Sequence, residues 1–293
     1  MNTIGAVFEW KKSSRPYIRR NPKKIVAKIF STIFLLLLAL LILVPVLWML
    51  MCSFRPETEL MKYPPKFFPE SLTIENFTNL LQRMQILTYL KNSVIYCVFT
   101  TVPQLLINSL AGYAFARYQF KGKNVLFICV LATMMIPFQV IMVPLFLEAV
   151  KLGMYDNFAG LLIPNWGVAI CIFMTRAAYA ALPKELEEAA RMDGLSEFGI
   201  YWKIMTPLIK PTLVTNLVLG INGAWNDLLW PLLMTTTPSM RTLANGLALF
   251  LETSLQYGTA FAGAFISVIP MMVLYIFGQQ YFVEGTATSG LKG

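Results

Sequence analysis

Six long apolar runs are the feature of this 293-residue chain that most restricts its fold. Each run has about 20 residues or more, which is the length that an α-helix needs to cross a lipid bilayer. Lipid offers no partner to an exposed backbone N–H or C=O group, so such runs are expected to be helical. They lie near residues 28–53, 91–117, 124–147, 157–182, 211–234 and 261–282. The sequence therefore predicts an all-α membrane protein with six transmembrane helices.

The composition agrees with several crossings of a membrane. Hydrophobic residues make up 57% of the chain and charged residues only 13%, which is too apolar for a soluble domain of this length. The first run begins too far into the chain and is too long for a cleaved signal peptide, so we expect it to be retained. No repeat or linker divides the sequence, and residues 28–283 are expected to form one transmembrane domain.

Lysine and arginine are concentrated in segments that would lie on one side of the membrane. The arm at residues 1–27 is rich in both and holds a single acidic residue, Glu9. Because cytoplasmic segments carry the excess of positive charge, we expect this arm, the loop at 183–210 and the tail at 284–293 in the cytoplasm. The net charge of +9 follows from this bias and from attraction to anionic lipid, so it predicts no nucleic-acid partner.

The chain lacks the residues that most enzymes and metal sites require. It contains no histidine, which removes the commonest general base and most zinc and haem ligands. Its four cysteines lie within or at the edges of apolar runs without paired spacing: Cys52, Cys97, Cys129 and Cys171. We interpret them as small hydrophobic residues. Gly122-Lys123 also lacks the flanking residues of a phosphate-binding loop, so we expect no catalytic residue, metal or cofactor in this chain.

The polar loop at residues 183–210 carries the most specific motif. Pro183 suits the first turn of a helix, and Asp193-Gly194 is a stop signal because glycine accepts the left-handed conformation. These signals predict a helix of about ten residues. A second short helix is expected after Ser196, a plausible N-cap. Its side chains would form an aromatic stripe of Phe198, Tyr201, Trp202 and Met205.

The first of these helices would present a face of small side chains. The residues that share this face are Leu186, Ala189, Ala190 and Asp193. Glu187 precedes Arg191 by four positions, the favourable order for an ion pair on a neighbouring face. Two helices this short must gain stability by packing on something else. The alternatives are an ordinary loop on the membrane surface and a docking element for another protein.

The spacing of this motif resembles the cytoplasmic coupling motif of ABC importer permeases. That family has Glu-Ala-Ala, three residues, Gly, nine residues, Ile, one residue and then Leu-Pro. The matching residues here are Glu188, Ala189, Ala190, Gly194, Ile204 and Pro207, and Thr206 replaces the usual Leu. By this resemblance these residues, with Asp193, would couple the chain to an ATPase.

A second resemblance lies in the fifth apolar run. The segment Trp225-Asn226-Asp227, followed by Trp230-Pro231, is similar to the fifth-helix signature of carbohydrate permeases. An acidic residue within an apolar run suggests function, and for Asp227 a structural or gating role and direct contact with solute both remain open. Trp225 and Trp230 are expected to be interfacial anchors. Polar or aromatic residues that could line a sugar path, or simply bond one helix to another, are Gln139, Asn165, Trp166, Asn222 and Asn226.

Together with a tail ending Gly-Leu-Lys-Gly, these motifs resemble the MalG-like subunit of a carbohydrate ABC importer over nearly the whole chain. The resemblance implies the MetI-like fold of type I importers, with both termini in the cytoplasm, in a bacterial cell membrane. It also implies a second permease subunit forming a pseudo-symmetric heterodimer, two ATP-binding subunits that hold ATP and Mg, and an extracytoplasmic sugar-binding protein. The tail at 284–293 would reach the ATPase dimer.

Other functions remain open from the residues alone. A permease for glycerol phosphate or a polyol is compatible with the same motifs. An ion-coupled secondary transporter would need buried acidic residues at mid-membrane and internal repeats. The single acidic candidate here, Asp227, is expected near the outer edge of the membrane and argues against this class. A membrane enzyme would need an acid–base cluster or metal.

Overall fold

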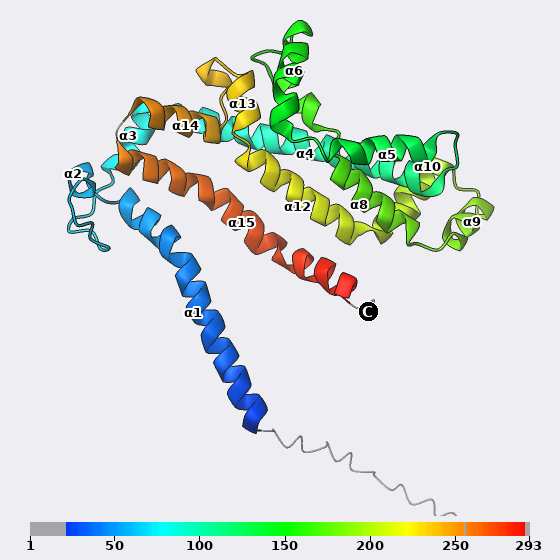
Figure 1. Cartoon of the computed structure of the whole chain (residues 1–293), viewed down its shortest axis with the longest axis horizontal. Helices are drawn as coiled ribbons and strands as arrows, with labels where there is room; N and C mark the ends of the chain where they lie inside the picture. The colour runs from blue at the N-terminus through cyan, green and yellow to red at the C-terminus, as the bar shows by residue number, and fades with distance from the viewer. Residues whose placement is uncertain (1–21, 255, 291–293) are drawn as a thin grey trace, which may run out of the picture. The chain divides into compact units, whose positions relative to one another are not determined.

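The structure of the protein is a computed structural model that describes residues 22–254 and 256–290 (Figure 1). The chain divides into two compact units, Met1–Trp48 and Met49–Gly293, which are considered separately here. Most of the predicted basic arm lies outside the described residues, as does the end of the predicted tail. All regular elements in the described part are helical.

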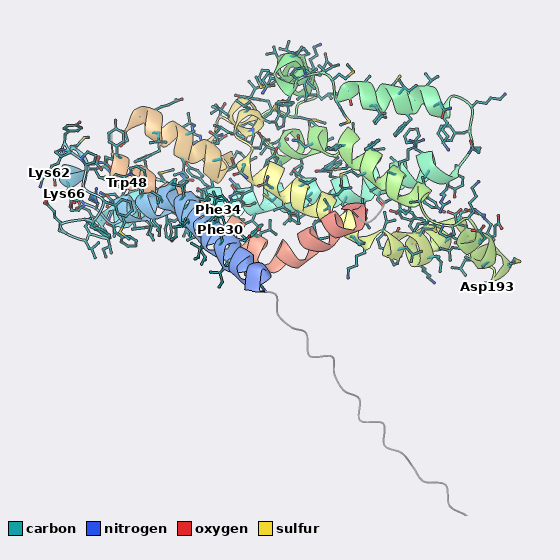
Figure 2. The ribbon with its side chains drawn as sticks, turned by 60° about the horizontal axis from the view of Figure 1, so that its bottom comes forward. Phe30, Phe34, Trp48, Lys62, Lys66 and Asp193 are labelled. Carbon is teal, nitrogen blue, oxygen red and sulfur yellow. The ribbon has the colours of Figure 1, made fainter. Side chains whose placement is uncertain are left out.

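The described part of the first unit belongs to a single long helix, α1 (Pro22–Ser53), whose last turns enter the second unit. The helix begins at Pro22, within the range that the sequence assigns to the arm. Its stretch Lys28–Ser53 is long and apolar enough to cross a membrane. Large side chains on it are exposed, among them Phe30 at 72% and Phe34 at 57% (Figure 2). Such exposure suits contact with lipid rather than with water.

The second unit is organised around helix α4 (Ile86–Arg117), which packs against α8 (Ala169–Ala180) and α12 (Lys210–Asn226). These helices lie side by side in Figure 1. Glycines allow the close approach: a Cβ at Gly112 would collide with Thr175 of α8, and one at Gly220 of α12 would lie 2.7 Å from Thr101 Cγ2. Small residues at such contacts are typical of packed transmembrane helices.

Two of the predicted spans, 124–147 and 157–182, are bent pairs of helices. Helices α5 (Lys123–Thr133) and α6 (Phe138–Lys151) meet at 103°, and α7 (Phe158–Leu162), with the 3-10 turn η1 (Ile163–Asn165), meets α8 at 42°. A third bent pair, at 82°, joins residues 197–208 of the predicted loop to α12 and does not coincide with the predicted span 211–234. With α1, α4 and the final helix, the described chain has up to six candidate spans if each bent pair counts as one.

The predicted fifth span, 211–234, is not continuous. Helix α12 ends at Asn226, Asp227 is extended with φ −69° and ψ 120°, and α13 (Leu229–Met234) begins two residues later. The Asp227 carboxylate accepts a hydrogen bond from the Trp230 N–H at 3.4 Å. A side chain that binds an N–H in the first turn stabilises a new helix start, which explains why the chain restarts here.

Short helices surround the N-terminal end of α4. They include α2 (Glu57–Leu60), α3 (Glu75–Arg83), η3 (Pro238–Met240) and α14 (Leu243–Thr253). Helix α15 (Tyr257–Gly290) packs on α3, α12 and α14. It continues through Gly290 instead of ending near Phe282, so residues 284–290 of the predicted tail are helical.

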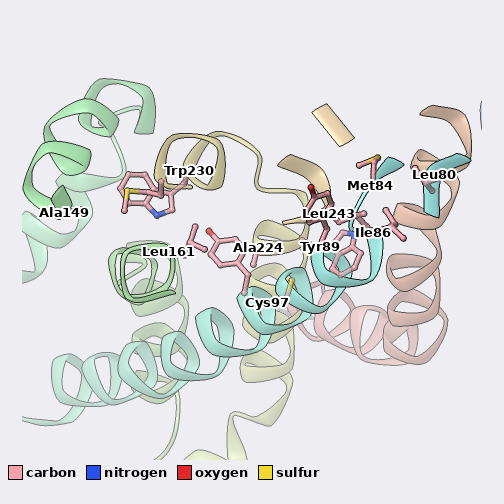
Figure 3. Packing of buried hydrophobic residues seen from close by; sticks show 13 residues of the cluster. Leu80, Met84, Ile86, Tyr89, Cys97, Ala149, Leu161, Ala224, Trp230 and Leu243 are labelled. Carbon is pink, nitrogen blue, oxygen red and sulfur yellow. The ribbon is translucent and has the colours of Figure 1, made fainter. Parts of the chain in front are cut away.

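Two groups of buried side chains form the core of this unit. The first gathers around Tyr89, Trp230 and Leu243 (Figure 3). The second lies at the C-terminal end of α4 and joins Tyr113 and Tyr179 to Ala190 and Tyr201 of the loop that carries the coupling motif. That loop forms α9 (Glu185–Met192), α10 (Glu197–Gly199), the π-helix η2 (Ile200–Met205) and α11 (Thr206–Leu208).

Candidate functional site

The first short helix of the motif loop forms as its local signals predict, with one shift. Helix α9 begins at Glu185, so Pro183 lies just ahead of the first turn rather than inside it. Asp193 is the C-cap, and Gly194 has φ +80°. The left-handed backbone at Gly194 confirms the predicted stop, since a side chain there would be strained. Figure 2 shows Asp193 at the tip of this loop.

The faces of α9 differ from the predicted ones. Only Glu187 and Ala190 are buried, at 5% exposure each, whereas Leu186, Glu188, Ala189, Met192 and Asp193 are exposed. The predicted face of small residues is therefore split, because Ala190 points into the core and Ala189 points outward. The exposed face keeps the small side chain of Ala189 beside the carboxylate of Glu188.

The predicted ion pair between Glu187 and Arg191 is wrong. Glu187 Oε1 lies 3.3 Å from Arg117 Nε at the end of α4. Arg191 instead makes a two-pronged pair with Glu197, with its Nε 2.6 Å from Oε1 and its Nη2 3.1 Å from Oε2. Spacing within one helix predicted the pair, but the fold gives each side chain a charged partner from another segment. The pKa of Glu197 lies below its ordinary value because Arg191, and then Tyr118, hydrogen-bond the carboxylate.

The second short helix begins as predicted, since the Ser196 hydroxyl accepts the Gly199 N–H at 3.2 Å. Its predicted aromatic stripe is divided. Tyr201 and Met205 are buried, whereas Phe198 and Trp202 are 67% and 51% exposed. Residues four apart stay on one face, so the four side chains form two pairs facing different ways. Of the remaining motif residues, Ile204 is half-buried against the second core group and Pro207 is exposed.

A buried network of hydroxyl groups fastens this loop to the transmembrane helices. Ser109 Oγ of α4 lies 2.9 Å from the Tyr179 hydroxyl and accepts the Tyr201 hydroxyl at 3.1 Å. The Tyr179 hydroxyl is also 3.0 Å from Thr206 Oγ1. The ring of Tyr113 lies 5.1 Å from that of Tyr179 and 5.2 Å from that of Tyr201. Such satisfied buried networks hold helices in one arrangement.

A pocket of about 260 Å³ lies next to the break at Asp227. The Tyr96 hydroxyl donates to Asp227 Oδ2 at 2.6 Å, and Asn165 Nδ2 donates to the same hydroxyl at 3.2 Å. Thr100 and Gln104 also line the pocket, and the Thr100 hydroxyl is buried without a hydrogen-bond partner. The structure thus brings the predicted Asn165 and Asp227 together at a mainly apolar cavity whose few polar groups can bind hydroxyl-bearing groups.

Other predicted path residues lie elsewhere. Trp166 Nε1 donates to the Phe99 carbonyl at 2.9 Å, and Gln139 is exposed on α6. Asn222, Trp225 and Asn226 border a separate pocket of about 340 Å³. Trp225 and Trp230 are both buried, so their interpretation as interfacial anchors is wrong. Trp225 Nε1 donates to the Ser267 carbonyl and Trp230 Nε1 to the Gly160 carbonyl, each at 3.0 Å.

Sequence reasoning missed Tyr96, Thr100 and Gln104. They recur every four residues along α4 and continue to Asn108, all of them buried. Polar residues at a spacing of four inside an apolar run are a signal for a shared helix face. That signal was present in the sequence and marks the side of α4 that faces the pocket.

Comparison with known proteins gives a consistent result. Residues 108–286 match the family described as "Binding-protein-dependent transport system inner membrane component". The chain is 35% identical over 282 residues to the "Arabinooligosaccharides transport system permease protein AraQ" of Bacillus subtilis (strain 168), covering 94% of this chain and 100% of that protein. It is 31% identical over 277 residues to the "Trehalose/maltose transport system permease protein MalG" of Thermococcus litoralis, covering 92% and 99%.

A solved structure supports the same fold. A chain of "a bacterial ABC transporter involved in the import of the acidic polysaccharide alginate" superposes with a TM-score of 0.77 at 26% identity, covering 89% of this chain and 98% of that one. A chain of the "MetNI methionine ABC transporter" superposes with a TM-score of 0.52 at 18% identity. The helical permease fold predicted from the sequence is therefore confirmed.

Proposed function

Because the chain belongs to the family of inner membrane components of binding-protein-dependent transport systems, we propose that it imports a sugar or oligosaccharide as the permease subunit of an ATP-driven transporter. The family makes the chain a transport component embedded in a membrane. The names of its relatives, arabinooligosaccharide and trehalose/maltose permeases, support a carbohydrate as solute. A bacterial cell membrane is the proposed location.

The observation that carries this proposal is the construction of the motif loop. Helix α9 is fixed at its rear by the second core group, while Glu188 and Ala189 remain exposed at its front. A rigid short helix with a small exposed face suits docking into a groove of another protein. We propose that this face couples the chain to an ATP-binding subunit, with Asp193 and Gly194 shaping the turn and Ile204 and Pro207 securing the second helix.

The proposed assembly contains four kinds of component. A second permease subunit would form a pseudo-symmetric heterodimer with this chain, two ATP-binding subunits would hold ATP and Mg, and a sugar-binding protein would deliver the solute. Exposed apolar side chains on α5 and α6, such as Val125, Ile128 and Val140, suit lipid or such a second subunit. No cofactor is proposed for this chain itself.

We place part of the solute path or its gate at the Asp227 pocket. Asp227 and Tyr96 offer an acceptor and a hydroxyl there, and Asn165 offers an amide. Sugars present many hydroxyl donors, which suits these groups. The negative charge of Asp227 would repel a phosphate group bound in the same pocket. The pocket therefore favours a neutral sugar or polyol over glycerol phosphate.

The test is uptake into vesicles that contain the complete transporter. The permease pair, the ATP-binding subunits and the solute-loaded binding protein would be reconstituted, and entry of radiolabelled maltose or arabino-oligosaccharide measured. We expect uptake that requires both ATP and the binding protein, and that fails with a non-hydrolysable ATP analogue. Uptake by the permease alone along an ion gradient would contradict the proposal and favour a secondary transporter.

A further inference from the structure

An arginine lies inside one of the candidate membrane spans. Arg176 belongs to α8, the second half of the bent span over residues 158–180. Among the described residues it has no carboxylate within 4.0 Å, whereas Arg55, Arg117 and Arg191 each pair with a glutamate. A charge in a membrane span is costly and marks a functional site by default. A group from outside the described chain is therefore needed to compensate this cation.

The protein orients the Arg176 guanidinium and leaves part of its hydrogen-bonding capacity unused. Its Nε donates to the Phe115 carbonyl of α4 at 3.4 Å, and its Cζ lies 4.0 Å from the ring centre of Phe127 on α5. The negative face of an aromatic ring attracts a cation placed over it. Neither Nη atom makes a hydrogen bond within the described part of the chain. Two N–H-bearing groups are thus available for a two-pronged bond to an anion.

Two further cations lie where α4 ends and α5, which packs against α8, begins (Figure 1). Lys123, the first residue of α5, donates from Nζ to the Tyr118 carbonyl at 2.8 Å. It precedes Phe127 by four positions, so the two side chains share a face of α5. Lys121 is exposed in the turn just before it, and the first turn of α5 holds no acidic residue. Three cations, with Arg176, are thus gathered at the end of α4.

Charges within the protein do not balance these three cations. The carbonyl end of α4 carries roughly half a negative charge and the amide end of α5 roughly half a positive charge, so the two helix ends cancel. Glu187 is already paired with Arg117 at this end of α4. Glu197, which accepts the Tyr118 hydroxyl, is already paired with Arg191. The positive charge of the three cations therefore remains to attract an anion.

Large apolar side chains lie one turn deeper on the faces that carry two of these cations. Leu126 follows Lys123 by three positions on α5 and is 52% exposed. Phe173 precedes Arg176 by three positions on α8 and is 43% exposed. Both helices belong to candidate membrane spans. Cations near the end of a span, with apolar side chains deeper in it, match the two parts of a phospholipid, its charged headgroup and its acyl chains.

We propose that the corner formed by α4, α5 and α8 binds the phosphate group of an anionic phospholipid. The Nη groups of Arg176 and the Nζ of Lys123 bind the phosphate, Lys121 adds to the attraction, and the acyl chains lie along Leu126 and Phe173. Basic sites between transmembrane helices on the cytoplasmic side suit such headgroups, and the charge bias predicts that this end of α4 is cytoplasmic. The site requires only that the chain is embedded in a membrane, so it does not depend on the solute.

The lipid preference can be measured beside the site. In a background without the four native cysteines, Asn124→Cys, at an exposed position next to Lys123, carries a bimane fluorophore. The complete transporter is placed in nanodiscs of phosphatidylcholine and phosphatidylglycerol, and one lipid at a time is brominated so that it quenches the fluorophore. We expect the ratio of association constants to favour phosphatidylglycerol at least about tenfold, because several cations act on one headgroup.

Arg176→Gln and Lys123→Gln each remove one cation and keep a long polar side chain. Each should lower the preference for phosphatidylglycerol about fivefold, the usual contribution of a single cation near an anionic headgroup. The matched control is Lys210→Gln, which removes an exposed lysine that likewise begins a helix, α12, and should leave the preference unchanged. If Arg176→Gln does not insert, Lys123→Gln at the start of α5 carries the same test.

An unchanged preference in Arg176→Gln and Lys123→Gln, or an equal loss in Lys210→Gln, would overturn the proposal. So would a parent protein in which neither lipid quenches the fluorophore, since a partner subunit would then cover the corner. Inorganic phosphate, exchanged for chloride at equal ionic strength, should not displace the lipid, and displacement would assign the site to free phosphate instead. None of these measurements needs ATP or solute, so a failure of sugar uptake would count against the proposed function alone.

Discussion

The two ends of α4 attach their neighbours by different kinds of hydrogen bond. At the N-terminal end, Asn92 Nδ2 donates to the carbonyls of Ser239 and Arg241 at 2.7 and 2.9 Å, and Ser93 Oγ accepts the Leu243 N–H at 2.8 Å. At the C-terminal end, most of these bonds join two side chains, as in the pairs of Tyr113 with Glu187 and of Tyr201 with Ser109. An exception is Arg117, whose Nη2 donates to the Leu182 carbonyl at 2.8 Å.

The difference follows from what each end meets. The N-terminal end meets the turn around η3 and the start of α14, where backbone groups are not used by a helix and need partners. The C-terminal end meets mostly helical segments, whose backbone groups are already paired, so side chains supply most of the partners there, and the Leu182 carbonyl, which Arg117 binds, lies outside a helix. Bonds to backbone fix the path of a loop whatever its sequence. Bonds between side chains can distinguish one residue from the next.

The largest effect is expected at the exposed face of α9, which lies next to the C-terminal end of α4. Glu188→Lys should leave the protein inserted but reduce uptake at least about tenfold, which corresponds to about 1.4 kcal/mol of docking free energy. The reason is that a reversed charge would face the proposed ATPase groove. Uptake and ATPase activity of the reconstituted complex would be measured together. The control is Glu148→Lys, which reverses the charge of another exposed carboxylate, on α6. Normal uptake in Glu188→Lys would contradict the proposed docking of α9 on an ATP-binding subunit.

A smaller effect is expected at the N-terminal end. Asn92→Ala removes two hydrogen bonds and leaves two part-buried carbonyls without their donor, at a cost of about 1–3 kcal/mol. Thermal unfolding of the purified permease pair in detergent would report the loss. Asn124→Ala, the same change at an exposed position, should be close to neutral. Equal melting temperatures for the two variants would mean that the amide does not hold the turn.

The hydroxyl network offers a finer test of the C-terminal end. Tyr201→Phe keeps the packed ring and removes only the bond to Ser109, so we expect a loss of about 0.5–1.5 kcal/mol. The same unfolding assay applies, with Tyr63→Phe at an almost fully exposed position as the control. A loss as large as that of Asn92→Ala would show that the hydroxyls matter more at this end than single bonds suggest.

The smallest effect concerns pH and the loop between α6 and α7. Desolvation by burial raises the pKa of Asp156, but hydrogen bonds from the Thr237 hydroxyl and from the N–H groups of Thr236 and Thr237 outweigh it, so the pKa lies below its ordinary value. A carboxyl group whose pKa is lower in the folded than in the unfolded protein stabilises the fold at pH values above the unfolded pKa, which is about 4. This contribution is lost as the pH falls through the folded pKa. Asp156→Asn should therefore melt with a weaker pH dependence between about pH 5 and pH 3. An identical dependence in both proteins would contradict this.

Sequence signals that act within a few residues predicted the structure well. The stop at Gly194 and the cap at Ser196 each depend on local backbone chemistry. The failures involve partners distant in the sequence. The spacing of Glu187 and Arg191 was favourable, but Arg117, seventy positions earlier, gave Glu187 a buried partner that no local rule could reveal. The burial of Trp225 and the 103° bend between α5 and α6 likewise depend on packing.

The length of α4 has a mechanical consequence. Its 32 residues correspond to a rod of about 48 Å, and its tight contacts with α8 and α12 leave those three helices little freedom to slide past one another. A force applied at α9 would therefore act on the rod as on a lever. Tilting it by about 10° around its midpoint would displace each end by roughly 4 Å. A small movement of α9 would then displace η3 and α14, at the other end of α4, in the opposite direction.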